Sequence, residues 1–125
     1  PLAFDVLALP GGRAGAQTLA RDARILETIR SFVKMNKLVA AVCAGPLALL
    51  GAGVLNGRRL TCHPDVAPEI TEGLWINEPV VVDGLLVTSQ GPGTSFLFAL
   101  SIIRILEGAE KAEKIARGLI LPSSF

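Results

Sequence analysis

The chain has 125 residues, a length that suits a single domain with one hydrophobic core. Half of the residues are hydrophobic and only 18% are charged, with a mean hydropathy of +0.53, which is typical of strands that helices cover on both faces. The 12 basic and 11 acidic residues leave a net charge of +1, without a basic block longer than Arg58-Arg59, so neither nucleic acid nor a membrane is favoured as a partner.

The two cysteines and the first residues of the chain indicate its cellular compartment and its origin in a longer polypeptide. Cys43 and Cys62 do not form the framework of a disulfide-rich domain, so we expect a reducing compartment, the cytoplasm. No signal or transit sequence is visible. The chain begins at Pro1 without a methionine and enters a predicted strand almost at once, which we interpret as the later part of a longer polypeptide.

The first half of the chain alternates predicted strands with predicted helices. A short apolar strand precedes the turn residues Pro10-Gly11-Gly12, and an amphipathic helix with apolar residues at helical spacing follows them. A second apolar strand then leads into a helix rich in Ala and Leu. These four elements are Phe4–Leu9, Gln17–Met35, Leu38–Val42 and Pro46–Leu55.

The second half adds a short strand, a hairpin and two helices. His63-Pro64 ends the strand, because the residue before a proline avoids the helical region, and Asp83-Gly84 is a strong turn signal for the hairpin. The alternation predicts an α/β fold with a mostly parallel sheet between helices. The expected elements are a strand at Arg59–Cys62, a short helix at Val66–Glu72, hairpin strands at Val80–Val82 and Leu85–Thr88, a helix from Thr94 or Ser95 to Glu107, and a helix at Ala109–Arg117.

Cys43 lies between the second strand and the helix that begins at Pro46, with room for only a sharp turn. The unpaired N–H groups and the dipole of a helix N-terminus favour negative charge, so this position favours a thiolate. Two other interpretations remain open. The uncharged run Leu38–Leu55 reaches the length of a membrane span, about 18 residues, although Gly45-Pro46 at its centre argues against one. Cys43 could also be a small buried hydrophobic residue.

Three groups of residues fall at the predicted carboxyl ends of strands. Gly11-Gly12 follow the first strand, Cys43 the second and His63 the third. Ligands of parallel α/β sheets bind outside those ends, so their convergence favours a functional Cys43. For His63, a structural role is as open as direct proton transfer, and the glycine pair could serve only the turn. Cys62 is interpreted as a buried strand residue.

Four segments resemble the DJ-one/ThiJ/PfpI superfamily: LPGGRAGAQTL (Leu9–Leu19), AAVCAGP (Ala40–Pro46), TCHP (Thr61–Pro64) and TSQGPGTSFLFAL (Thr88–Leu100). Within it they resemble the branch of the Parkinson's-disease-associated protein and its ThiJ-like relatives. The resemblance implies a flavodoxin-like three-layer sandwich, usually a homodimer. It implies that residues 1–125 are the C-terminal portion of a single domain.

The resemblance also implies roles for individual residues. Cys43 matches the family's reactive cysteine, and His63 matches the histidine near it. The N–H groups of Gly12 and Ala44 match the positions that hold an oxyanion, and Gly11 belongs to the same substrate-binding turn. Arg13 stands where family members often have Asn.

The front of the chain departs from the family. Roughly 60 residues, about two βαβ-sized units, precede the glycine pair in the family. They include a strand and a helix whose glutamate hydrogen-bonds the thiol, and no acid of this chain corresponds to it. We hypothesise that these elements come from a separate polypeptide, the N-terminal segment of the same precursor.

The resemblance implies a cysteine-dependent glyoxalase or protein deglycase that acts on methylglyoxal-type dicarbonyls or their adducts, without a metal or organic cofactor. The alternative is an oxidative-stress sensor or redox-regulated chaperone in which Cys43 is oxidised. A third possibility is an inactive product of protein turnover. The protease-like branch matches less well, because Ala44 stands where a histidine usually follows the cysteine.

Overall fold

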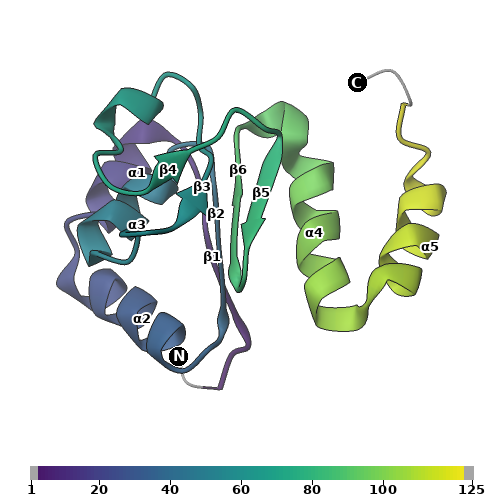
Figure 1. Cartoon of the computed structure of the whole chain (residues 1–125), viewed down its shortest axis with the longest axis horizontal. Coiled ribbons are helices and arrows are strands. Elements are labelled where there is room, and N and C mark those ends of the chain that lie inside the picture. The colour runs from purple at the N-terminus through teal and green to yellow at the C-terminus, as the bar shows by residue number, and fades with distance from the viewer. Residues whose placement is uncertain (1–2, 123–125) are drawn as a thin grey trace.

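The computed structural model describes residues 3–122, so residues 1–2 and 123–125 of the expected domain lie outside the described part. The described residues form a four-stranded sheet between two groups of helices (Figure 1). In chain order the elements are β1 (Val6–Leu9), α1 (Arg13–Leu19), α2 (Ala23–Lys34), β2 (Leu38–Val42), α3 (Pro46–Ala52), β3 (Arg59–Leu60), the 3₁₀ turn η1 (Ala67–Glu69), β4 (Leu74–Trp75), β5 (Val80–Asp83), β6 (Leu86–Ser89), the 3₁₀ turn η2 (Pro92–Thr94), α4 (Ser95–Glu107) and α5 (Ala109–Leu119).

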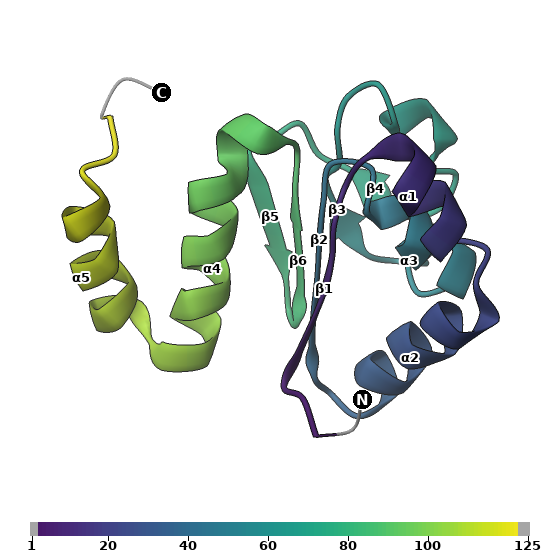
Figure 2. The ribbon, with the colours of Figure 1, turned by 180° about the vertical axis from the view of Figure 1, so that it is seen from behind.

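The main sheet has the strand order β1-β2-β6-β5. β1, β2 and β6 are parallel, whereas β5 pairs antiparallel with β6 in the predicted hairpin. Helices α1, α2 and α3 lie on one side of the sheet, and α4 lies on the other with α5 packed against it (Figure 2). The predicted three-layer α/β architecture with a mostly parallel sheet is confirmed.

The central strand β2 supplies apolar side chains to both layers. Val39 and Ala41 belong to the core beneath α2 and α3, together with buried Ile29 and Phe32. Leu38, Ala40 and Val87 face the opposite layer, where residues of α4 pack against them. Successive side chains of a strand point to opposite faces, which is why an uninterrupted apolar run suits this position. The α4 residues in this contact are Phe98, Ile102 and Ile105.

The long helix predicted over Gln17–Met35 is wrong in its boundaries. The structure has two helices there, α1 and α2, separated by Ala20, Arg21 and Asp22. The Asp22 carboxylate accepts a hydrogen bond from the N–H of Arg24 at 2.9 Å and thereby caps α2. Apolar spacing does not reveal this break, because Leu19 and Leu26 are seven residues apart, a spacing that also fits one continuous helix.

The third predicted strand does not belong to the main sheet. β3 is only two residues long and pairs with β4, a strand that the sequence did not predict, in a separate two-stranded sheet. Beyond β3, the Thr61 N–H donates to the Thr88 side-chain hydroxyl at 2.9 Å rather than to a neighbouring strand's carbonyl. The carboxyl end of β2 is therefore flanked by β1 and β6. The prediction that the glycine pair, Cys43 and His63 follow three strands of one sheet is therefore wrong for His63. The glycine pair and Cys43 follow β1 and β2 of the main sheet, whereas His63 lies in a loop after β3.

The remaining elements lie close to their predicted positions. The expected helix over Val66–Glu72 is the shorter turn η1, while α4 ends at Glu107 as predicted and α5 extends two residues beyond Arg117. The helices of the described part are all too short or too polar to cross a membrane, so the membrane-span interpretation of Leu38–Leu55 is not supported.

Candidate functional site

Cys43 directly follows β2 and precedes the turn into α3. Its φ angle is 62°, a left-handed conformation that is uncommon for a residue with a side chain and costs about 1 kcal/mol or more. Two hydrogen bonds fix its backbone: its N–H donates to the Ser89 carbonyl at 3.0 Å, and its carbonyl accepts from the His63 N–H at 3.1 Å. The side chain is partly exposed. This is the geometry of a strained turn that presents a nucleophile.

Two glycines allow neighbouring backbone to approach this turn. A Cβ atom at Gly11 would lie 2.7 Å from the Cys43 Cβ and 3.3 Å from its Sγ, and one at Gly45 would lie 2.6 Å from the Leu9 carbonyl oxygen. Either side chain would therefore collide with the turn, because real Cβ atoms do not come so close to other heavy atoms. The structure thus brings the predicted Gly11 into direct contact with Cys43.

Gly12 directly follows Gly11 in the sequence, and Ala44 directly follows Cys43. Gly12 is the residue before α1 and has a φ of 82°, while Ala44 follows Cys43 and is buried. Within residues 3–122, neither N–H donates a hydrogen bond to another protein atom. Unpaired N–H groups beside a nucleophile are able to bind a negatively charged oxygen.

The backbone of His63 contacts Cys43, but its imidazole is directed to other residues. Its Nδ1 accepts a hydrogen bond from the Asp65 N–H at 3.1 Å and lies 3.8 Å from the Asp65 carboxylate. Its Cδ2 would be 3.6 Å from a Cβ at Gly91. A neutral imidazole that accepts at Nδ1 carries its proton on Nε2, so Nε2 is the donor available for chemistry. Among the described residues, the imidazole makes no hydrogen bond with the Cys43 thiol.

Cys62 differs from Cys43 in its surroundings. Its side chain is fully buried, and its Sγ donates a hydrogen bond to the His63 carbonyl at 3.4 Å. Burial is the main cause that raises the pKa of this thiol to about 11. A thiol with that pKa stays protonated at neutral pH and is a poor nucleophile. The predicted burial of Cys62 is confirmed, but its predicted place in a strand is wrong, because β3 ends at Leu60.

Asp65 and Glu69 are site-adjacent residues that the sequence did not reveal. Asp65 contacts His63, and the Glu69 carboxylate pairs with the Arg13 guanidinium, 2.6 Å from its Nη1. The pKa of Arg13 is raised, mainly by this hydrogen bond. In the sequence, only the position of Arg13 next to Gly12 places it near the site. Its pairing with Glu69 cannot be seen there, because Arg13 and Glu69 are 56 positions apart.

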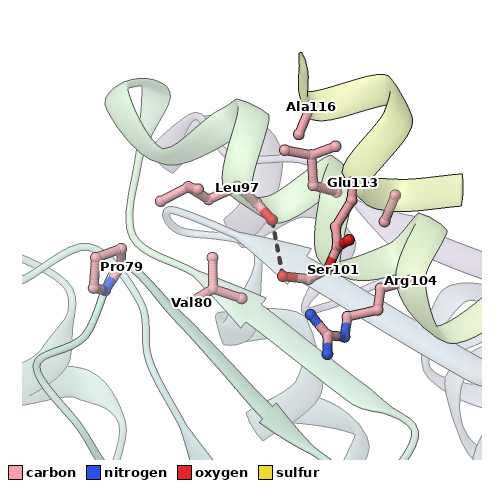
Figure 3. A pocket seen from close by; sticks show the side chains of 9 residues that line it. Pro79, Val80, Leu97, Ser101, Arg104, Glu113 and Ala116 are labelled. Atoms are coloured by element: carbon pink, nitrogen blue, oxygen red, sulfur yellow. Dashed lines mark hydrogen bonds between the residues drawn. The ribbon is translucent and has the colours of Figure 1, made fainter. Parts of the chain in front are cut away.

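Other parts of the described chain show different features. Within residues 3–122, no group of three or more His, Cys, Asp and Glu side chains could hold a metal ion. A cavity of about 390 Å³ lies between the start of β5 and the helices α4 and α5, and none of the five predicted site residues lines it (Figure 3). Its polar lining comes from Ser101, Arg104 and Glu113.

A partly exposed cysteine in a strained strand-to-helix turn, bordered by glycines and by two amides that donate no hydrogen bond within residues 3–122, defines a nucleophile-elbow α/β protein. The model of the DJ-1/PfpI family matches residues 1–105, so the chain belongs to this family. The sequence resemblance is thereby confirmed.

Known relatives place the chain in the DJ-1 branch. The Parkinson disease protein 7 homolog of Danio rerio is 41% identical over 94% of this chain and 64% of its own length. The glutathione-independent glyoxalase DJR-1.2 of Caenorhabditis elegans is 41% identical over 94% of this chain and 63% of its own length. The crystal structure of Drosophila melanogaster DJ-1beta superposes with a TM-score of 0.91 at 38% identity, over 95% of this chain and 65% of that one. The chain thus spans under two thirds of these relatives and has their flavodoxin-like fold.

Proposed function

We propose that this chain carries the nucleophile of a cysteine-dependent glyoxalase or protein deglycase that acts on methylglyoxal-type dicarbonyls or their adducts. The observation that carries the proposal is the Cys43 turn, with its φ of 62°, a partly exposed thiol and the Gly11 backbone against the side chain. The name of the Caenorhabditis elegans relative, a glutathione-independent glyoxalase, supports the same reaction.

The proposed reaction begins when the Cys43 thiolate attacks the aldehyde carbon of methylglyoxal. A carbon–sulfur bond forms, and the carbonyl electron pair moves to the oxygen, whose negative charge the N–H groups of Gly12 and Ala44 stabilise. The aldehyde proton then moves to the adjacent ketone carbon through an enediolate, which gives a thioester of lactate. Water hydrolyses this thioester, releasing lactate and the thiol. His63 would carry the proton through Nε2.

The test is lactate formation from methylglyoxal by the protein as purified, together with any polypeptide that accompanies it. Cys43→Ser and Cys43→Ala are expected to abolish turnover, whereas Cys62→Ala keeps it because the buried thiol stays protonated. Circular dichroism of each variant controls for folding. Turnover that persists in both Cys43 variants would overturn the proposal.

A redox sensor or redox-regulated chaperone is the second candidate, favoured by the partial exposure of Cys43 next to two N–H groups that form no hydrogen bond within residues 3–122. Those groups could hold the oxygens of a sulfinate at Cys43. Under this alternative, peroxide adds two oxygen atoms to the Cys43 peptide in mass spectra, and binding of an unfolded client protein changes with that mass. Dicarbonyl turnover without such binding favours the enzyme instead.

For the assembly, we propose a C-terminal portion of one domain that is completed by the N-terminal segment of the same precursor as a separate chain, within a cytoplasmic homodimer. Two observations support the further segment: the chain spans 63–65% of three relatives' length, and the outer edge of β1 pairs with no strand of the described residues. The homodimer and the cytoplasmic compartment are proposed from the family resemblance. Intact mass spectrometry of the purified protein tests it. A single 125-residue species that is folded and active would contradict it.

A further inference from the structure

The Arg13–Glu69 ion pair joins the two segments that contribute groups to the site. Arg13 is the first residue of α1 and directly follows Gly12, whereas Glu69 ends η1, the turn that follows His63. The Arg13 Nη1 lies 2.6 Å from the Glu69 Oε2. Within residues 3–122, no other ion pair connects α1 to η1.

An apolar contact joins the same two segments. Buried Ala16 of α1 and Val66, just before η1, belong to one apolar cluster with Ala44. The Asp65 carboxylate, which lies 3.8 Å from the His63 Nδ1, also attracts the Arg13 guanidinium. The α1 and η1 segments are therefore joined by an ion pair and by an apolar cluster that includes Ala44, the residue after the cysteine.

We propose that Arg13 and Glu69 form a clasp that holds the Gly11-Gly12 turn in register with the His63 segment. Arg13 and Glu69 are then positioning residues, and the inference rests on the proposed function. The reaction needs the Gly12 N–H and the His63 imidazole on the same bound substrate, although they belong to separate segments. Fixing both segments lowers the entropic part of the barrier, whereas the clasp itself touches no reacting atom.

The solvent exposure of the Arg13–Glu69 pair determines how much its loss should change folding and turnover. Its side chains are 47% and 43% exposed, and such pairs contribute little to folding, so loss of the clasp is expected to leave the fold intact. We expect Arg13→Ala and Glu69→Gln each to lower kcat/KM by about fivefold, mostly through kcat, which corresponds to about 1 kcal/mol in the barrier.

A second measurement moves in the opposite direction. Alkylation of Cys43 by the neutral reagent iodoacetamide is expected to become faster in both variants, because the segments that border the thiol separate more often. Salt screens an exposed pair, so the wild-type alkylation rate should rise with sodium chloride while that of Arg13→Ala stays constant.

Three further variants complete the test. Arg13→Lys keeps the charge, and the exchange Arg13→Glu with Glu69→Arg rebuilds the pair in reverse, so both are expected to recover most of the turnover and the slower alkylation. Arg24→Ala removes another ion pair, with Asp22 at the start of α2, whose side chains are 90% and 27% exposed, and should change neither rate.

The clasp is overturned if Arg13→Ala and Glu69→Gln keep the wild-type alkylation rate and its salt dependence, or if their effects add in the double mutant without recovery in the exchanged pair. Failure of the proposed function looks different, because turnover would then survive Cys43→Ser. The alkylation rates still report on the clasp in that case.

Discussion

The close contact between Gly11 and Cys43 predicts that a single added methyl group at Gly11 disturbs the site. Gly11→Ala places a Cβ 2.7 Å from the Cys43 Cβ and 3.2 Å from the Val42 carbonyl oxygen, so the turn must shift. We expect a loss of about 1–3 kcal/mol in the free energy of unfolding and a larger proportional loss of turnover. Urea denaturation and lactate formation measure the two effects.

The control is Gly15→Ala, inside α1, where a Cβ meets nothing within 4 Å. It should stabilise the protein by about 0.5–1 kcal/mol and leave turnover unchanged, because alanine is the better helix former. Equal effects of the two substitutions would mean that the Cys43 turn tolerates the added methyl group.

Thr61 and Thr88 form a pair with opposite expected behaviour. The Thr88 hydroxyl accepts from the Thr61 N–H at 2.9 Å, whereas the buried Thr61 hydroxyl has no hydrogen-bond partner among the described residues. Thr61→Val removes an unsatisfied group and should raise the free energy of unfolding by about 1 kcal/mol. Thr88→Val leaves the Thr61 N–H unpaired and should lower it by about 1–3 kcal/mol. Thermal unfolding of both variants measures these changes in stability. A Thr61→Val variant less stable than wild type would contradict the assignment of the Thr61 hydroxyl as unsatisfied.

At the same scale, the sequence predicted Cys43 but not its polar neighbours. An apolar strand, a glycine and a proline around a cysteine form a local pattern, so the turn could be inferred from adjacent residues. Asp65 hydrogen-bonds His63, and Glu69 forms an ion pair with Arg13. The ion pair depends on how η1 folds back toward α1. Nothing in the spacing of these charges distinguishes them from ordinary surface residues.

Among the elements, β3 is tied to the hairpin by Asp83. The Asp83 carboxylate accepts from the Arg59 N–H at 2.9 Å and from the Arg58 Nε at 3.3 Å, and these bonds, the first above all, lower its pKa below the ordinary 3.8. A carboxylate whose pKa is depressed by folding stabilises the native state above its unfolded pKa. That stabilisation disappears as the pH falls through the lower, folded value.

Asp83→Asn is therefore expected to be less stable than wild type at neutral pH, by an amount that stays constant down to the ordinary carboxylate pKa. The difference should shrink in more acidic solution, where the wild-type carboxyl also becomes neutral. Urea denaturation across this pH range measures it. A difference that persists unchanged in strong acid would assign the effect to side-chain shape rather than to charge.

The sequence predicted which elements exist better than where they pair. The Asp-Gly turn and the valine run sufficed for the β5–β6 hairpin, because both of its strands are local in sequence. The position of β3 depends on long-range groups instead, the Thr88 hydroxyl and the Asp83 carboxylate. The split between α1 and α2 was missed because Asp22 caps the second helix without any glycine or proline to mark the break.

For the whole molecule, α4 carries exposed apolar side chains in addition to those that pack on the sheet. Its Phe98, Ile102 and Ile105 pack on the sheet, yet Phe96 and Leu106 of the same helix are 58% and 48% exposed. A helix that is apolar on more than one face is normally buried, and exposed apolar patches mark interaction sites. This supports the proposed assembly, in which such a surface is covered.

The last prediction follows from that surface. Leu106→Glu should keep the far-ultraviolet circular dichroism of the wild type but lower the molar mass found by light scattering after size-exclusion chromatography, because a buried charge would oppose association. Phe98→Glu is the matched substitution on the packed side, where the same charge falls against Leu38, Ala40 and Val87 and should unfold the protein instead. Equal molar masses for wild type and Leu106→Glu would mean that α4 does not contribute to the interface, and the covered surface would then have to be sought at the outer edge of β1.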